Sequence, residues 1–337
     1  MSAGQIICFG ELLLRLAAPG RELLMQSGRF DVEVGGAEAN VAVALACLGH
    51  ASALISIVPD NALGRGAVSA VRARGVDCSR VSCGDGRMGL YFLSPGSGMR
   101  PAEVIYDRTA SAFADAPADA FDWPSLLTGA ARLHVSGITA ALGPNAAQAA
   151  IDAVTFARSA GIPVSFDCNY RSKLWERWTS DPRATLSTLI AAADMLFGNH
   201  RDVSLLLDKP FDGNDPDGRR RAAEAAFGTF PGLRYIASTA REVQTSDRHA
   251  LSARIDTPAQ GHETDAVVVD GIVDRIGAGD AFAAGILHGL HCGQDLQGIA
   301  ASGLALACLK HTLPGDASLF GRADIALFHS GARDVRR

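Results

Sequence analysis

Asp274-Arg275-Ile276-Gly277-Ala278-Gly279-Asp280 is a run of small and charged residues that leads directly into the apolar stretch 281–287. Two glycines followed by a helix-length apolar segment predict a tight loop that opens a helix. We expect the backbone N–H groups of Ala278, Gly279 and Asp280 to point outward without partners. Together with the positive end of the helix dipole, such groups bind anions.

A carboxylate in this first helical turn is unsuited to holding a phosphate by itself. We therefore interpret Asp280 as a general base that takes the proton of a substrate hydroxyl. The amides of Gly277, Ala278, Gly279 and Asp280 are then predicted to hold the phosphoryl group that this hydroxyl attacks. The segment thus indicates phosphoryl transfer to a small-molecule alcohol.

Outward from this loop, apolar runs alternate with helix-length amphipathic stretches along most of the chain. The expected strands are 6–9, 53–58, 133–136, 164–167, 195–197 and 235–237, and the expected helices are 39–48, 63–74, 144–160, 278–292 and 296–311. This alternation predicts an α/β fold, with a mainly parallel central sheet covered by helices on both faces. We expect one domain over residues 1–337, with a mobile loop at 208–221, which is rich in Asp, Gly, Pro and Arg.

Two segments, residues 12–34 and 88–113, interrupt this pattern with short strands and turns. We expect them to pair as a small β-sheet outside the main one, where a sheet at the mouth of a cleft acts as a lid that excludes water. The alternative is a pair of ordinary surface hairpins.

Composition excludes several classes of protein. The chain has 337 residues, 48% hydrophobic and 20% charged, and a net charge of -5 with a pI near 6.0 disfavours nucleic-acid binding. No apolar run reaches the roughly 18 residues of a membrane span, and the N-terminus lacks the basic leader of a signal peptide. Seven scattered cysteines favour reduced thiols in the cytoplasm. None of the three lysines follows a glycine, so a Walker phosphate loop is absent from the sequence.

Two groups of residues are candidates for substrate binding. Gly35 and Gly36 permit close approach of a ligand to the backbone, and the Asn40 amide suits sugar hydroxyls. The alternative is a tight strand-to-helix turn. Tyr106 and Arg108 share one face of an expected strand, so with Tyr91 they suit a polar ligand that carries a carboxylate. An exposed edge-strand arginine is the alternative there.

Polar residues also follow two expected strands at the edge where ligands bind in parallel sheets. Asn169 and Arg171 come after strand 164–167, and Arg171 suits donor phosphates or substrate. Asn199 and Asp202 follow strand 195–197, and their oxygens suit Mg²⁺ held through water. Ordinary polar loops, or a helix N-cap by Asn199, are the alternatives.

A histidine pair in the chain also bears on metal binding. His288 and His291 lie three residues apart on the helix that follows Asp280. No third ligand with suitable spacing lies near them, and solvated histidines are common on helix surfaces. We therefore interpret both as ordinary helix residues.

Together these motifs resemble the PfkB/ribokinase family of sugar kinases over nearly the whole chain. The similarity runs from Gly10-Glu11 through Gly35-Gly36-x-x-x-Asn40 and Asn199-x-x-Asp202 to Gly277-Ala278-Gly279-Asp280. Within the family, 2-keto-3-deoxygluconate kinases are most similar, on the evidence of 35–42, Gly89-Leu90-Tyr91, Tyr106-x-Arg108 and Asn169-Tyr170-Arg171. The family pattern differs at Arg275-Ile276, at Asp202 (often Glu) and at 239–243, where a Lys-x-Gly-x-x-Gly turn is usual.

The resemblance implies a ribokinase-like fold and ATP-dependent phosphorylation of the terminal hydroxyl of a six-carbon 2-keto-3-deoxy acid. It implies nucleotide contacts for Asn169, Asn199, Asp274, Ser238 and Thr239, with Mg²⁺ as cofactor and a monovalent cation as a possible one. A fructokinase or other ketose kinase, or a sensor that binds sugar or nucleotide without turnover, are the alternatives. The exposed edges of a β lid also favour a homodimer.

Overall fold

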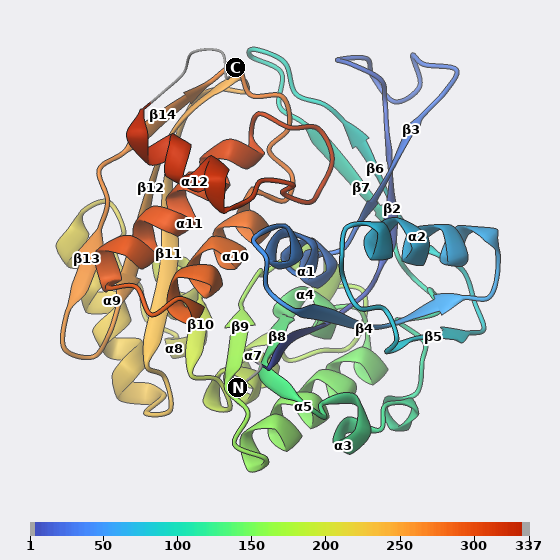
Figure 1. Ribbon diagram of the computed structural model, residues 1–337, viewed down its shortest axis with the longest axis horizontal. Coiled ribbons are helices and arrows are strands. Elements are labelled where there is room, and N and C mark those ends of the chain that lie inside the picture. Colours follow the sequence, from blue (N-terminus) through green and yellow to red (C-terminus); the bar gives the residue numbers. More distant parts are fainter. Residues whose placement is uncertain (1–3, 332–337) are drawn as a thin grey trace.

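The central sheet of the computed structural model, which describes residues 4–331, is built mainly of parallel strands (Figure 1). Its order is β13-β12-β11-β10-β9-β8-β1-β4-β5, and β14 pairs with β12. The strands from β11 to β5 pair in parallel, whereas β12, β13 and β14 are antiparallel. Their bounds are β1 Gln5–Phe9, β4 Ser52–Pro59, β5 Val81–Gly84, β8 Ala130–Ser136, β9 Val164–Asp167, β10 Met195–Phe197, β11 Tyr235–Thr245, β12 Arg248–Asp256, β13 Gly261–Glu263 and β14 Val267–Asp270.

Helices cover both faces of this sheet, as the alternation in β1 shows. Ile7 and Phe9 pack into one apolar cluster with α5, α7, α8 and α9, whereas Ile6 and Cys8 pack into a second with α1, α2, α10, α11 and α12. The helices are α1 Ala37–Cys47, α2 Ala62–Ala73, α3 Trp123–Leu126, α4 Gly137–Ala140, α5 Pro144–Ser159, α6 Ser172–Trp175, α7 Pro182–Ala191, α8 His200–Leu207, α9 Pro216–Thr229, α10 Ala278–His291, α11 Leu296–Lys310 and α12 Arg322–Ser330. The predicted fold class is therefore confirmed.

A separate four-stranded sheet has the order β3-β2-β6-β7, with β2 Leu13–Ala17, β3 Asp31–Gly35, β6 Gly89–Ser94 and β7 Glu103–Asp107. It rises beyond one end of the main sheet in Figure 1. The predicted small sheet is thus confirmed, because the first segment supplies β2 and β3 and the second supplies β6 and β7. Its inner face packs Leu13, Tyr91 and Leu93 against Ile276, just before the α10 loop.

Two local predictions were wrong. The loop expected at 208–221 ends earlier, because Asp215 caps α9 through the Gly218 N–H and Pro216 begins the helix. The strand expected at 235–237 continues to Thr245, because residues beyond Ala237 gain an antiparallel partner in β12. Among residues 4–331, no helix has both the length and the apolar character needed to cross a membrane.

Candidate active site

The carboxyl group of Asp280 lies in the first turn of α10 and is partly accessible to solvent. The Asn40 side chain, from the first turn of α1, donates from Nδ2 to Asp280 Oδ2 at 2.7 Å. Burial raises the pKa of Asp280 to about 8, and the carboxyl groups of Asp167, Glu38 and Asp316 add to the rise, while the Asn40 hydrogen bond opposes it. A carboxyl group with a pKa in this range is suited to act as a general base near neutral pH.

The loop before α10 presents part of the predicted anion site. Among residues 4–331, the N–H groups of Gly279 and Asp280 have no hydrogen-bond acceptor. The expectation for Ala278 was wrong, because its N–H turns back to the Arg275 carbonyl at 3.3 Å. Gly277 has φ +76°, and a Cβ there would lie 1.6 Å from the Asp316 carbonyl oxygen, so only glycine fits this turn.

Further acids gather near Asp280 from the carboxyl ends of β9 and β10. Burial raises the pKa of Asp167 to about 7, and the nearby Asp202 carboxylate adds to the rise. Burial likewise raises the pKa of Asp202 and of Glu38. Glu38 is fully buried in α1, where its Oε1 accepts from the Ser136 N–H and Oγ and from a third donor, Thr139 Oγ1. These acids have no basic ion-pair partner among residues 4–331, so a cation would relieve their repulsion.

The predicted residues around these acids are placed as follows. Asn199 caps α8, accepting from the Arg201 N–H, while Asp202 Oδ2 accepts from the Asn199 N–H at 2.8 Å. The N-cap alternative for Asn199 is therefore correct, and Asp202 Oδ1 takes part in no hydrogen bond or ion pair among residues 4–331. Asn169 has φ 35° and donates its N–H to Asp167. This hydrogen bond and the positive charge of exposed Arg171 partly offset the rise in the pKa of Asp167.

Asp274, whose contact with the nucleotide stays a prediction, belongs to an ionic cluster with Arg15 and Asp316. Arg15 Nη1 lies 2.7 Å from Asp274 Oδ2 and 2.9 Å from Asp316 Oδ1. Tyr91, predicted at the substrate, donates its hydroxyl to Asp316 Oδ2 at 2.6 Å. Lys310 is fully buried near this cluster, and burial lowers its pKa while Asp274 and Asp316 oppose that effect. The two cations offset the two carboxylates.

Arg108 is buried rather than exposed, because it forms an ion pair with Glu11. Its Nε lies 2.5 Å from Glu11 Oε2, and Ser111 Oγ donates to the other carboxylate oxygen. Neither Nη atom of Arg108 takes part in the hydrogen bonds of residues 4–331, so both remain available to a ligand. The edge-strand alternative for Arg108 is therefore wrong.

The glycines of the α1 entry pack closely against acids. A Cβ on Gly35 would lie 2.2 Å from Asp316 Oδ2, and one on Gly36, where φ is +140°, would lie 2.2 Å from the Glu11 carbonyl oxygen. The tight-turn alternative is thus correct, because the close packing of the backbone at this turn requires both glycines. Their predicted contact with substrate stays a prediction.

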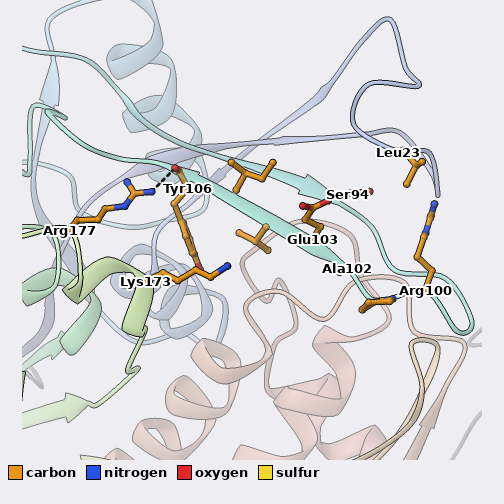
Figure 2. A pocket seen from close by; sticks show the side chains of 11 residues that line it. Leu23, Ser94, Arg100, Ala102, Glu103, Tyr106, Lys173 and Arg177 are labelled. Carbon is orange, nitrogen blue, oxygen red and sulfur yellow. Dashed lines mark hydrogen bonds between the residues drawn. The ribbon is translucent and has the colours of Figure 1, made fainter.

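A cavity of about 650 Å³ opens beside the inner face of the small sheet (Figure 2). Tyr106 projects into it, its ring 6.3 Å from that of Tyr91, and its carbonyl accepts from Arg177 Nη2 at 3.1 Å. Three cationic side chains, of Arg100, Lys173 and Arg177, line this cavity with a single acid, Glu103. The lining of this cavity therefore carries a net positive charge.

Ser238 and Thr239 lie on β11 just past Ala237, the last residue that pairs with β10. Both residues therefore lie on a continuous strand. At this place the family usually has a Lys-x-Gly-x-x-Gly turn, which the sequence of residues 239–243 does not match. Arg241, two residues on, lies near Arg275, and burial together with repulsion from Arg275 lowers its pKa.

Sequence reasoning missed Glu11, Arg15, Glu38, Lys310 and Asp316. Glu11 directly follows the first strand, as Asp167 ends another, so its position at the ligand-binding edge was readable. Lys310 and Asp316 carry no local signal, because their partners lie far away in the sequence.

Comparisons with known proteins agree with this geometry. The pfkB family carbohydrate kinase model matches residues 3–319. The chain belongs to the pfkB family of carbohydrate kinases. A 2-dehydro-3-deoxygalactonokinase of Haloferax volcanii is 34% identical over 93% of this chain and 92% of its own length. The crystal structure of 2-dehydro-3-deoxygluconokinase from Thermotoga maritima superimposes with a TM-score of 0.92 at 34% identity, covering 97% of this carbohydrate kinase and 100% of that chain.

Proposed function

We propose that this carbohydrate kinase transfers a phosphoryl group from ATP to the terminal hydroxyl of a six-carbon 2-keto-3-deoxy sugar acid. The observation that carries the proposal is Asp280, held by Asn40 beside the open N–H groups that begin α10. The names of the Haloferax and Thermotoga relatives support this class of substrate. Those two names differ in the sugar, so the epimer is left to experiment. Use of ATP is consistent with a cytoplasmic site of action.

In the proposed mechanism, the Asp280 carboxylate accepts the proton of the attacking hydroxyl as the new O–P bond forms. Asn40 holds the carboxylate in place through its 2.7 Å hydrogen bond. The N–H groups of Gly279 and Asp280 stabilise the charge that builds on the transferring phosphoryl oxygens. One well-placed donor of this kind stabilises the transition state by about 3 kcal/mol.

Asp167 and Asp202 would hold Mg²⁺, directly or through water, with Asn199 beside them. Their chemistry supports this role: both are acids with pKa values raised by burial, and neither has a basic ion-pair partner among residues 4–331. Bound Mg²⁺ supplies positive charge against the donor phosphates. Arg241 and Arg275, whose charges lie close together near the start of α10, are proposed to contact the same phosphates.

An acidic sugar is supported by the positive charge along its proposed entry. Arg100, Lys173 and Arg177 line the cavity beside Tyr106 (Figure 2) and would steer a carboxylate inward. The free Nη atoms of Arg108 are then proposed to bind that carboxylate. A ketose kinase is the second candidate, because Glu11 already neutralises Arg108 and a neutral sugar would leave that pair intact.

We propose that the small sheet closes over the substrate as a lid and that two lids form a dimer. Val32, Leu16, Phe92 and Ile105 form one apolar row across the four strands, in register. Val32 is 59% and Ile105 48% exposed, which is unusual for a solvated sheet face. Light scattering of the wild type and of the Val32→Glu variant tests this: a wild-type dimer that becomes a monomer in the variant supports the lid dimer, and an equal mass for both proteins contradicts it.

A coupled assay of ADP release tests the reaction, using 2-keto-3-deoxygluconate, its galacto epimer, fructose and ribose at equal concentration. We expect turnover with at least one keto-deoxy acid and little with fructose or ribose. Asp280→Asn should lower turnover by several orders of magnitude while the sugar still binds in calorimetry. Near-normal turnover of Asp280→Asn would contradict the assigned base, and preference for fructose would favour the ketose kinase.

A further inference from the structure

A second cluster of metal-ligating side chains lies at the opposite end of α10 from Asp280. His288 and Cys292 extend from the end of α10, and His50 approaches from the segment between α1 and β4. Their ligand atoms all lie within 4.8 Å of one another. His288 is 8 positions beyond Asp280, which at 1.5 Å per residue places the cluster roughly 12 Å from the candidate base.

The distances are close to those of a metal centre. His50 Nε2 lies 2.7 Å from His288 Nδ1, and Cys292 Sγ lies 3.7 Å from the same nitrogen. Tetrahedral zinc, with bonds of roughly 2.0–2.1 Å to nitrogen and 2.3 Å to sulfur, requires separations of about 3.3 Å and 3.6 Å respectively. Insertion of an ion therefore requires the two imidazole nitrogens to move apart from 2.7 Å to about 3.3 Å. Sequence reasoning set His288 and His291 aside for want of a third ligand. The fold brings His50 to His288, and Cys292 completes a set that does not include His291.

The backbone holds these ligands in place without a metal. The His50 N–H donates to the Leu45 carbonyl at 3.0 Å after Gly49 turns the chain at φ +79°. The Cys292 N–H donates to the His288 carbonyl at 2.9 Å, so both residues stay on one face of the last helical turn. Such preorganisation lowers the ordering cost of binding.

The electrostatic setting also suits a cation. Helices α1 and α10, which lie side by side, both end here, and the negative ends of their dipoles favour positive charge (Figure 1). The positive charge of Arg322 would repel a cation here, but its Nε donates to the Leu48 carbonyl at 2.6 Å.

Access for an ion is open. A cavity of about 330 Å³, lined in part by Gly49, His50, Cys292 and Arg322, leads to the cluster, and the Cys292 side chain is exposed. Imidazole nitrogen and thiolate sulfur are both ligands of zinc, and three protein ligands leave one tetrahedral position for water.

We propose that His50, His288 and Cys292 bind one Zn²⁺ ion, with water as the fourth ligand, at a site separate from the phosphoryl-transfer centre. On binding, Zn²⁺ replaces the proton on Cys292 Sγ, and that proton passes to solvent. The ion ties the end of α10 to the segment that links α1 to β4. The proposal is independent of which sugar the kinase phosphorylates.

Titration of chelator-treated full-length protein with Co²⁺ tests the site, because a thiolate ligand gives a charge-transfer band in the near ultraviolet. We expect one Co²⁺ per chain, that band, and displacement by Zn²⁺. Cys292→Ser should abolish the band, and His288→Ala should weaken Zn²⁺ binding at least about tenfold.

Matched controls separate the site from incidental binding. Cys83→Ser alters another exposed cysteine and His262→Ala a histidine far along the chain, and both should bind like the wild type. Cys292→Ser changes an exposed side chain, so circular dichroism should confirm its fold. Absence of the band in the wild type, or its loss in Cys83→Ser instead, would overturn the proposal.

Discussion

Replacement of Asn40 by alanine should shift the pH dependence of the kinase in a predictable direction. In the wild type, the Asn40 amide stabilises the ionised form of Asp280 across 2.7 Å and holds its pKa down at about 8. A hydrogen bond to a charged group contributes about 1.5–3 kcal/mol, and one pKa unit corresponds to about 1.4 kcal/mol. Asn40→Ala should therefore raise the pKa of Asp280 by about one to two units.

The consequence for activity follows from the role of the base. Only ionised Asp280 accepts a proton, so activity falls as the pH drops below its pKa. The acid limb of kcat/KM should move upward by about one to two pH units, and at pH 7 the variant should lose about 10- to 100-fold. At high pH the two curves should approach each other.

The assay is the pH profile of kcat/KM for the sugar at saturating nucleotide, measured by ADP release. Asn145→Ala is the matched control, since its amide donates to a backbone carbonyl on the surface and touches no acid of the site. If Asn40→Ala lowers kcat/KM by the same factor at every pH and leaves the acid limb unmoved, the reasoning is refuted. Asn40 would then act on the sugar hydroxyls and not on Asp280.

Three further perturbations test the ionic design of the site. Because the pKa of Asp280 is raised from 3.8 to about 8, its ionisation destabilises the fold progressively as pH rises between these values. Above pH 8, Asp280→Asn should therefore melt at a higher temperature than the wild type, with a free energy of unfolding larger by at most about 6 kcal/mol. Equal melting temperatures at pH 9 would contradict the raised pKa. Arg108→Gln leaves the Glu11 carboxylate without its ion-pair partner and should lower the free energy of unfolding in urea by about 3–5 kcal/mol. The double variant Glu11→Gln/Arg108→Gln should recover much of that stability but should still phosphorylate the acid sugar slowly. Recovered activity on the acid sugar would limit Arg108 to a structural role. Arg15 and Lys310 offset Asp274 and Asp316, so replacing K⁺ by tetramethylammonium should leave turnover unchanged, and a loss of several-fold would indicate a monovalent-cation site.

Local signals were sufficient wherever a residue's role depends on its immediate neighbours. The loop before α10 was readable because glycine at 277 and the apolar run after it act within a few positions. The extension of β11 was not readable, because β12 supplies the hydrogen bonds that keep residues 238–245 extended. The early start of α9 was missed although Asp215-Pro216 is an N-cap followed by a proline, which is a recognisable helix start.

Side-chain pairing lay beyond the sequence because the partners are distant. Arg15 and Asp274 are separated by 259 positions, and Glu11 and Arg108 by 97. Nothing in either segment specifies the other before the sheet order is known. Arg108 and Tyr91 could thus be assigned to the lid segment from the sequence. Their contacts with Glu11 and Asp316, which fix the orientation of the two side chains, could not be predicted.

This pairing separates two kinds of acid around the start of α10. Asp274, Asp316 and Glu11 each have an arginine within 3 Å, so their charges are compensated by the fold itself. Asp280, Asp167, Asp202 and Glu38 have no such partner in the part of the chain that the structure describes, and burial raises the pKa of each. A fold gains nothing from acids that are shielded from solvent and lack a compensating charge, since their ionisation only costs stability. Their gathering at one place is explained if the missing positive charge arrives with the metal and the donor phosphates at each turnover.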